Sequence, residues 1–165
     1  MKSLEEEFKK IKSKLDIIGK KIKTLNSDFT SLGKFFKISE RNWYKFKGHC
    51  YYYSTNLTDW FTAENNCRKI GGYLVKINEK AENEALSTNR PLKKEHYWIG
   101  LTDLTEGQYR WIHDQTKATY LPWYSGYGAL GTKHNCVMFH RQLAQWADYL
   151  CEYKWRYICE RNHCF

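Results

Sequence analysis

The sequence lacks the long apolar stretches that enter or cross membranes. No segment of its 165 residues approaches the roughly 20 consecutive apolar residues of a membrane span, so no span is expected. The start, from Met1 to Glu7, is charged where a secretory leader would be apolar. We therefore expect that a leader was either removed or never present.

The sequence also lacks the motifs of common catalytic and metal sites. It contains no nucleophile elbow, no phosphate-binding loop and no His-Glu-x-x-His helix, and its serines and histidines show no spacing that predicts a triad. His134 and His140 form only a pair, whereas a zinc site needs three or four converging ligands. We therefore expect no enzyme activity and no metal site.

The cysteines favour disulfides and an oxidising compartment. No repeated Cys-x-x-Cys is present. An even number of cysteines without metal-site spacing is typical of a disulfide framework, so we expect three disulfides in a secreted protein. Asn56-Leu57-Thr58 is an N-glycosylation acceptor that fits this compartment and predicts a glycan on Asn56. The cysteines are Cys50, Cys67, Cys136, Cys151, Cys159 and Cys164.

The formal charge of +9 is concentrated in the N-terminal part of the chain. Residues 1–38 contain ten lysines against five acidic residues, which is more than half of the surplus. Such a surplus raises affinity for acidic glycans, nucleic acid or anionic surfaces without selecting one of them, and a solvated lysine face produces the same pattern. We expect no nucleic-acid partner.

Residues 1–38 have the apolar spacing of a coiled coil. A single helix with this pattern would leave one apolar stripe in water, so we predict a homo-oligomer through residues 4–32. Gly19 weakens the helix, and the bulky Phe8 and Phe29 favour a trimer or a loosely packed dimer over a compact one. The alternative is that this amphipathic helix packs on its own globular domain. The stripe consists of Leu4, Phe8, Ile11, Leu15, Ile18, Ile22, Leu25, Phe29 and Leu32.

The pattern changes after residue 42, and residues 39–165 are expected to form a separate α+β domain. Two short alternating strands flank a Lys47-Gly48 turn. A helix follows with Thr58 or Asp59 as its cap, and Gly71-Gly72 stops it. A second helix is expected over residues 79–86, and the remainder consists of short strands and a long loop.

Several segments between residues 43 and 160 resemble the C-type lectin-like domain family and follow its order. The resemblance implies two helices that flank small antiparallel sheets, adjacent termini and a long loop that carries the binding site. The segments are Cys50-Tyr51-Tyr52-Tyr53-Ser54, Trp60-x-x-Ala63-x-x-x-Cys67, Gly72-Tyr73-Leu74-Val75, Tyr97-Trp98-Ile99-Gly100-Leu101-Thr102-Asp103, Tyr109-Arg110-Trp111, Cys136-Val137, Trp146 and Tyr157-Ile158-Cys159-Glu160.

The resemblance also implies a disulfide pairing. Family members join the cysteines at the positions of Cys67 and Cys159, and those at Cys136 and Cys151. Long forms of the family pair the position of Cys50 with an earlier cysteine, which would fall at Ser39. Because the family's first and last strands are neighbours, we predict a bond from Cys50 to Cys164, with a bond between chains as the alternative.

The calcium site of the family's lectins is largely missing. These lectins hold Ca²⁺ with a Glu-Pro-Asn or Gln-Pro-Asp triplet, an acid before the third conserved cysteine and a Trp-Asn-Asp triplet. Here the positions hold Tyr127-Gly128-Ala129, His134 and Trp146-Ala147-Asp148. Because Ca²⁺ requires six to eight oxygen ligands and only Asp148 remains, we expect no calcium cofactor.

The long loop carries the residues most suited to bind a ligand. Aromatic rings stack on sugars or anchor protein partners, and nearby basic groups suit acidic glycans. Trp123 is expected in the core by family position, and Tyr120 fits either core or surface. The sequence predicts a recognition protein for an extracellular carbohydrate, with a protein partner or a basic binder of acidic glycans as alternatives. The candidate ligand-binding residues are Tyr124, Tyr127, Lys133, His134 and Asp148.

Overall fold

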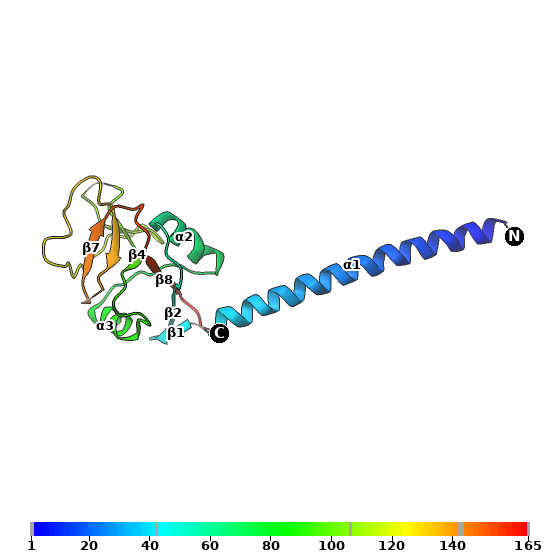
Figure 1. Cartoon of the computed structure of the whole chain (residues 1–165), viewed down its shortest axis with the longest axis horizontal. Coiled ribbons are helices and arrows are strands. Elements are labelled where there is room, and N and C mark those ends of the chain that lie inside the picture. The colour runs from blue at the N-terminus through cyan, green and yellow to red at the C-terminus, as the bar shows by residue number, and fades with distance from the viewer. Residues whose placement is uncertain (1, 42, 106, 142–143, 165) are drawn as a thin grey trace. The chain divides into compact units, whose positions relative to one another are not determined.

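The computed structural model divides the chain into two units, Met1–Arg41 and Asn42–Phe165. It describes residues 2–41, 43–105, 107–141 and 144–164, without the side chains of residues 2 and 32–41. The first unit is a single helix, α1 (Lys2–Arg41), and the second holds all other helices and strands (Figure 1).

Helix α1 continues past residue 38 to Arg41. At 1.5 Å per residue it is about 60 Å long. The apolar stripe from Leu4 to Phe29 is 52–77% exposed in the single chain. Leu32, the last residue of the predicted stripe, lies outside the described side chains. None of the helices in the described ranges combines the length and apolarity that crossing a bilayer needs.

The second unit begins with the β-hairpin that the sequence predicts. Strands β1 (Trp43–Phe46) and β2 (His49–Tyr53) pair antiparallel, and Trp43 lies opposite Tyr52. The two turn residues, Lys47 and Gly48, both have positive φ, at 46° and 85°. A two-residue turn of this kind matches the right-handed twist of the strands, and it explains the glycine.

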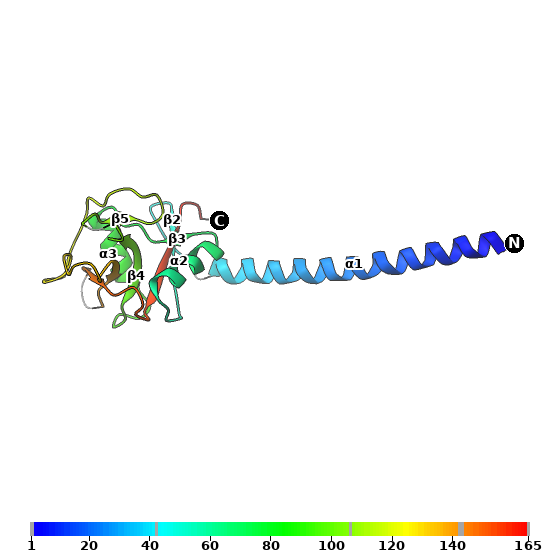
Figure 2. The same cartoon turned by 90° about the horizontal axis from the view of Figure 1, so that it is seen from above.

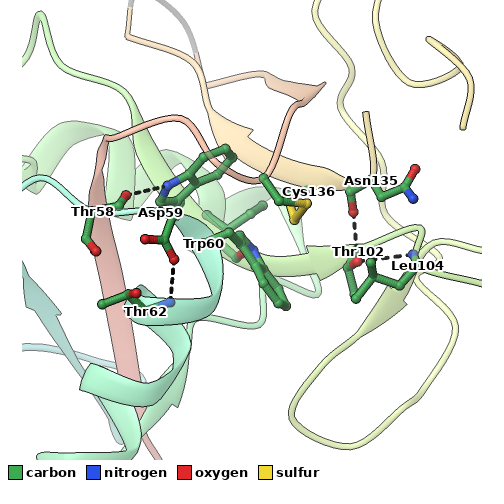
Figure 3. Close-up of a disulfide and its surroundings, with 11 residues drawn as sticks. Thr58, Asp59, Trp60, Thr62, Thr102, Leu104, Asn135 and Cys136 are labelled. Atoms are coloured by element: carbon green, nitrogen blue, oxygen red, sulfur yellow. Dashed lines mark hydrogen bonds between the residues drawn. A yellow bond between two sulfur atoms is a disulfide. The ribbon is translucent and has the colours of Figure 1, made fainter. Parts of the chain in front are cut away.

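Helix α2 (Trp60–Lys69) begins as the sequence indicates. Its cap is Asp59, whose carboxylate accepts the Thr62 N–H at 2.8 Å (Figure 3). The helix ends at Ile70, and the N–H groups of Gly71 and Gly72 close the last turn on helix carbonyls at 3.0 Å. Helix α3 (Lys80–Asn89) occupies the second predicted position but continues three residues past residue 86.

One sheet joins all eight strands in the order β1-β2-β8-β4-β6-β7, with β3 paired to β8 and β5 to β4. The pair β4/β8 is parallel, which corrects the expectation of antiparallel sheets alone. Strand β8 lies between β2 and β4, and these two neighbours run in opposite directions. Because β8 is antiparallel to β2, it is parallel to β4. The remaining strands are β3 (Tyr73–Leu74), β4 (Tyr97–Thr102), β5 (Arg110–Trp111), β6 (Cys136–Phe139), β7 (Trp146–Tyr149) and β8 (Arg156–Arg161).

The two short helices cover different parts of this sheet. Helix α2 contacts β3, β4 and β8, whereas α3 contacts β1. In Figures 1 and 2 the long loop, coloured from green to yellow, runs outside the strands. The expected α+β architecture, with two short helices beside the sheet and a long loop, is confirmed.

The core is rich in tryptophan, and three of its buried indole N–H groups donate to oxygens of the protein. Trp60 donates to the Ile99 carbonyl at 2.8 Å, and Trp98 donates to the Thr58 carbonyl at 2.9 Å (Figure 3). Trp146 donates to Oδ1 of Asn83 at 2.9 Å. Because burial of an unpaired indole N–H is costly, these bonds orient the rings as well as stabilise them.

Three disulfides close the unit, and no described cysteine is free. They join Cys67 to Cys159, Cys136 to Cys151 and Cys50 to Cys164, which are the pairs expected from the sequence. Cys50 lies opposite Arg161 in the β2/β8 pairing, so the following residues bring Cys164 within a Cα–Cα distance of 5.7 Å. The N-terminal hairpin is therefore tied to the C-terminal end within one chain.

Candidate functional site

The long loop, residues 112–135, is anchored on strand β7. The Trp146 N–H donates to the Pro122 carbonyl at 2.9 Å, and the Tyr124 N–H donates to the Trp146 carbonyl at 2.7 Å. These two bonds form an isolated parallel bridge between Trp123 and Trp146. These bonds fix the loop to the sheet at Trp123, and the residues that follow extend outward from there.

Two aromatic residues of the loop support it from below. Trp123 packs against Tyr109 with ring centroids 4.8 Å apart, and it also packs against Trp146. Tyr120 meets Trp146 edge-on at 5.6 Å, and its hydroxyl accepts a hydrogen bond from Asn83 at 3.2 Å. Both side chains are partly buried against the core, so Tyr120 is a packing residue here.

Asp148 lies beneath the loop and is 1% exposed. Its Oδ1 accepts the Gly128 N–H at 2.8 Å, and its Oδ2 accepts the Leu130 N–H at 3.0 Å. The Tyr109 hydroxyl donates to the same Oδ2 at 3.0 Å. Asp148 thus holds the loop from beneath, and its predicted part in ligand binding stays a prediction.

Gly128 lets the loop pass over Trp123. It has a φ of 96°, and a Cβ at this position would lie 2.6 Å from the Trp123 ring. A side chain would therefore be strained by the backbone and would also clash with the indole. The requirement for glycine is a consequence of the loop's close packing on the sheet.

An aromatic strip, defined as Tyr127, Tyr124, His140 and His96, follows the edge of this loop. Tyr124 stacks on His140 with centroids 4.2 Å apart and an interplanar angle of 11°. The ring centroid of Tyr127 lies 5.8 Å from that of Tyr124, and the ring centroid of His96 lies 5.0 Å from that of His140. All four side chains are half-buried; for the two tyrosines, their position on a loop had favoured exposure. A ligand would meet ring edges and part of each face.

The histidines of this strip are uncharged near neutral pH. Burial and then the neighbouring basic side chains lower the pKa of His96 to about 4. The same causes, in the same order, lower the pKa of His140. The strip therefore presents neutral aromatic surface, which suits the C–H faces of a sugar or apolar protein groups.

The two remaining predicted residues lie at the far end of the loop. Lys133 is exposed, whereas His134 is half-buried, and its ring meets Tyr149 edge-on with the ring centroids 5.8 Å apart. The Nδ1 atom of His134 has no hydrogen-bond partner among the described residues. The structure thus brings Tyr124 and Tyr127 together, but it shows no contact between that pair and Lys133 or His134.

The described residues do not fit a calcium ion of the usual kind. Within the described ranges, no group of three or more histidine, cysteine, aspartate or glutamate side chains is placed to hold a metal. The one remaining family ligand, Asp148, has its oxygens occupied by protein donors. Sequence reasoning missed the part that His96 and His140 play in the strip, because each meets its neighbours only through the folded sheet.

A profile of the Lectin C-type domain matches residues 56–161. The chain is 33% identical over 123 residues to a perlucin-like protein of Mytilus galloprovincialis, which covers 71% of this chain and 79% of that protein. It is 32% identical over 129 residues to C-type lectin domain family 4 member E of Mus musculus, covering 72% of this chain. The match covers 58% of the mouse protein, so the chain spans little more than half of its length.

Solved structures show the same relationship. The carbohydrate-recognition domain of the mouse scavenger receptor C-type lectin superimposes with a TM-score of 0.69 at 28% identity. This match covers 74% of the chain and 94% of that domain. The profile spans more than half of the chain, and the fold and disulfides agree with it. The chain therefore belongs to the C-type lectin family, in which this module is a carbohydrate-recognition domain.

Proposed function

We propose that this chain is a secreted, oligomeric lectin that binds an extracellular carbohydrate through the aromatic strip and the long loop without the usual calcium ion. The observation that carries the proposal is the position of Asp148. Two backbone N–H groups and one hydroxyl group occupy its carboxylate, so the protein itself holds the loop in place.

Calcium binding in the usual mode would be unfavourable here. Ca²⁺ loses several tightly held waters on binding and needs carboxylate and amide oxygens to replace them. The segment between Gly126 and Cys136 contains no acidic residue. Use of Asp148 as a ligand would also leave the N–H groups of Gly128 and Leu130 without an acceptor, at a cost of about 1–3 kcal/mol each.

The surface that replaces the metal is aromatic and neutral. Tyr124 and His140 stack as a pair, and Tyr127 extends the strip along the loop. Half-buried rings lose little side-chain entropy on binding, which favours stacking on a sugar ring. The exposed Leu130, three residues after Tyr127 in the loop, adds apolar area that also suits a protein partner, so a protein ligand is the second candidate.

The stalk supports avidity. The exposed apolar stripe of α1 is best buried against copies of itself, which would place several domains on one stalk. Linked weak sites bind a repetitive surface more tightly than one site does. Asn56 is exposed, as a glycosylated residue of a secreted protein must be.

The proposal is tested by glycan-array binding of the full chain in calcium and again in chelator. We expect the same glycans to bind in both conditions, and Tyr124→Ala with Tyr127→Ala to abolish that binding. Phe61→Ala is the control, because Phe61 is an exposed aromatic residue on α2, outside the loop. Chelator-sensitive binding of mannose or galactose would overturn the calcium argument. Full binding by the tyrosine variant would overturn the proposed surface.

A further inference from the structure

A second recess lies where the end of α3 meets the segment after β6. It has a volume of about 440 Å³ and is lined by Ser87, Arg90, Lys93, Lys94 and Arg141. Four of these five residues are basic and none is acidic. A pocket of this size accommodates a monosaccharide unit with a charged substituent. We call it the basic pocket.

Arg90 forms the fixed part of the basic pocket. It is 3% exposed and lies 4.8 Å over the ring of Phe139. Its guanidinium donates to the His140 carbonyl at 2.8 Å, to the Ser87 hydroxyl at 3.2 Å and to the carbonyls of Ser87 and Arg141 at 3.4 Å. All of these acceptors are neutral, so no carboxylate balances this buried charge.

The exposed part of the pocket carries three further basic side chains. Lys93 donates to the carbonyls of Ser87 and Thr88 at the end of α3, where a cation is favoured. Lys94 and Arg141 are exposed, and their side chains form no hydrogen bond or ion pair with the described residues. The Ser87 hydroxyl accepts from Arg90, which leaves its own O–H free to donate. These groups are suited to surround an anion.

His140 connects the basic pocket to the aromatic strip. Its backbone carbonyl accepts from Arg90, and its ring stacks on Tyr124. The charges of Arg90 and Arg141 contribute, after burial, to the lowered pKa of His140. One ligand can therefore place an anionic group in the pocket while its sugar ring lies against the strip.

We infer that the basic pocket binds the sulfate or carboxylate group of an acidic glycan, so that the ligand of this domain is an anionic saccharide. This inference rests on the proposed carbohydrate function and names its ligand class. A saccharide fits better than a polynucleotide, because the cations line one recess instead of a track of successive phosphates.

The test measures binding of short oligosaccharides to the full chain by calorimetry at physiological salt. The probes are a chondroitin sulfate tetrasaccharide, a hyaluronan tetrasaccharide that has carboxylates alone, and a neutral tetrasaccharide. The pocket variant combines Lys94→Gln with Arg141→Gln. The control variant combines Lys69→Gln with Lys80→Gln, which removes two exposed charges outside both the pocket and the long loop.

We expect the pocket variant to lose about tenfold or more in affinity for the acidic probe, since two charge-assisted contacts are removed. The control variant is expected to stay within about twofold of the parent, because distant exposed charges are screened. Binding of chondroitin sulfate but not hyaluronan would identify a sulfate pocket, and binding of both would identify a general anion pocket.

Equal loss in the two double variants would overturn the inference, because it would show attraction by net charge alone. Equal affinity for a single-stranded oligonucleotide of matched charge would also overturn it. Binding of the neutral probe alone, lost in Tyr124→Ala, would refute the basic pocket and leave the proposed function standing. If Tyr124→Ala keeps full affinity for the acidic probe while the pocket variant loses it, the pocket is supported and the loop surface is wrong.

Discussion

Replacing Asp148 with asparagine tests whether this buried carboxylate holds the long loop in its conformation through hydrogen bonds. The amide keeps one acceptor oxygen but places an N–H₂ where the other oxygen stood. With Oδ1 kept in place, Tyr109 can rotate its hydroxyl to accept, but the Leu130 N–H then faces a donor. With the amide flipped, the Gly128 N–H loses its acceptor instead.

The expected loss in unfolding free energy is about 3 kcal/mol. An unpaired buried N–H costs about 1–3 kcal/mol, and the remaining bonds weaken by about 0.5–1 kcal/mol each when a charged acceptor becomes neutral. Tyr109→Phe removes one donor and leaves the carboxylate intact, so it should cost only about 1 kcal/mol. Asp114→Asn changes an exposed carboxylate bonded to Lys76 and Thr116, and should cost less than about 1 kcal/mol.

Denaturant unfolding gives the free energies, and hydrogen exchange at the Gly128 and Leu130 amides shows whether the loop itself opens. We expect both amides to exchange faster in Asp148→Asn and to be unaffected by Asp114→Asn. Millimolar Ca²⁺ should not raise the stability of the parent chain. The reasoning fails if Asp148→Asn is as stable as the parent with both amides still protected, or if calcium stabilises the parent strongly.

Three further predictions concern the stalk, the loop and the pH response. Ile18→Ser should dissociate the oligomer in sedimentation experiments, whereas Ile17→Ser should not, because Ile17 is equally exposed at 52% but lies outside the apolar stripe. Dissociation by both variants or by neither would contradict the predicted seam. Gly128→Ala should lower the unfolding free energy, measured by heat or denaturant, by about 2–4 kcal/mol, because backbone strain and a clash with Trp123 combine. Gly126 also has positive φ but open space around it, so Gly126→Ala should cost about 1 kcal/mol, and equal costs would refute the close packing. Because the pKa of His96 is lowered to about 4, the unfolded chain binds the proton first, and stability should fall from about pH 6.5 to pH 4. His96→Phe should reduce that fall by on the order of 2 kcal/mol in measurements of unfolding free energy against pH, and an unchanged fall would contradict the role of His96.

The sequence by itself determined the features that depend on local pattern or on residue identity. The heptad spacing of α1, the Lys47-Gly48 turn and the Asp59 cap are short-range signals that act through backbone preferences. The family motifs predicted the α+β fold and two of the disulfides. The expected adjacency of the family's first and last strands predicted the third disulfide, from Cys50 to Cys164. The prediction that the usual calcium site is missing also comes from the sequence, because it depends on which oxygen ligands are present, and it stays a prediction.

Only the tertiary structure decided what Asp148, the one family calcium ligand kept in this sequence, and the aromatic and basic residues near the loop do. Asp148 looked like a surviving ligand in sequence, but the course of the loop brings the N–H groups of Gly128 and Leu130 onto it. Arg90 and His140 are fifty residues apart and meet because Arg90, which follows α3, lies over the Phe139 ring at the end of β6 and lines the basic pocket there. Such contacts depend on strand register and loop path, which involve the whole chain, so no local pattern of residues predicts them.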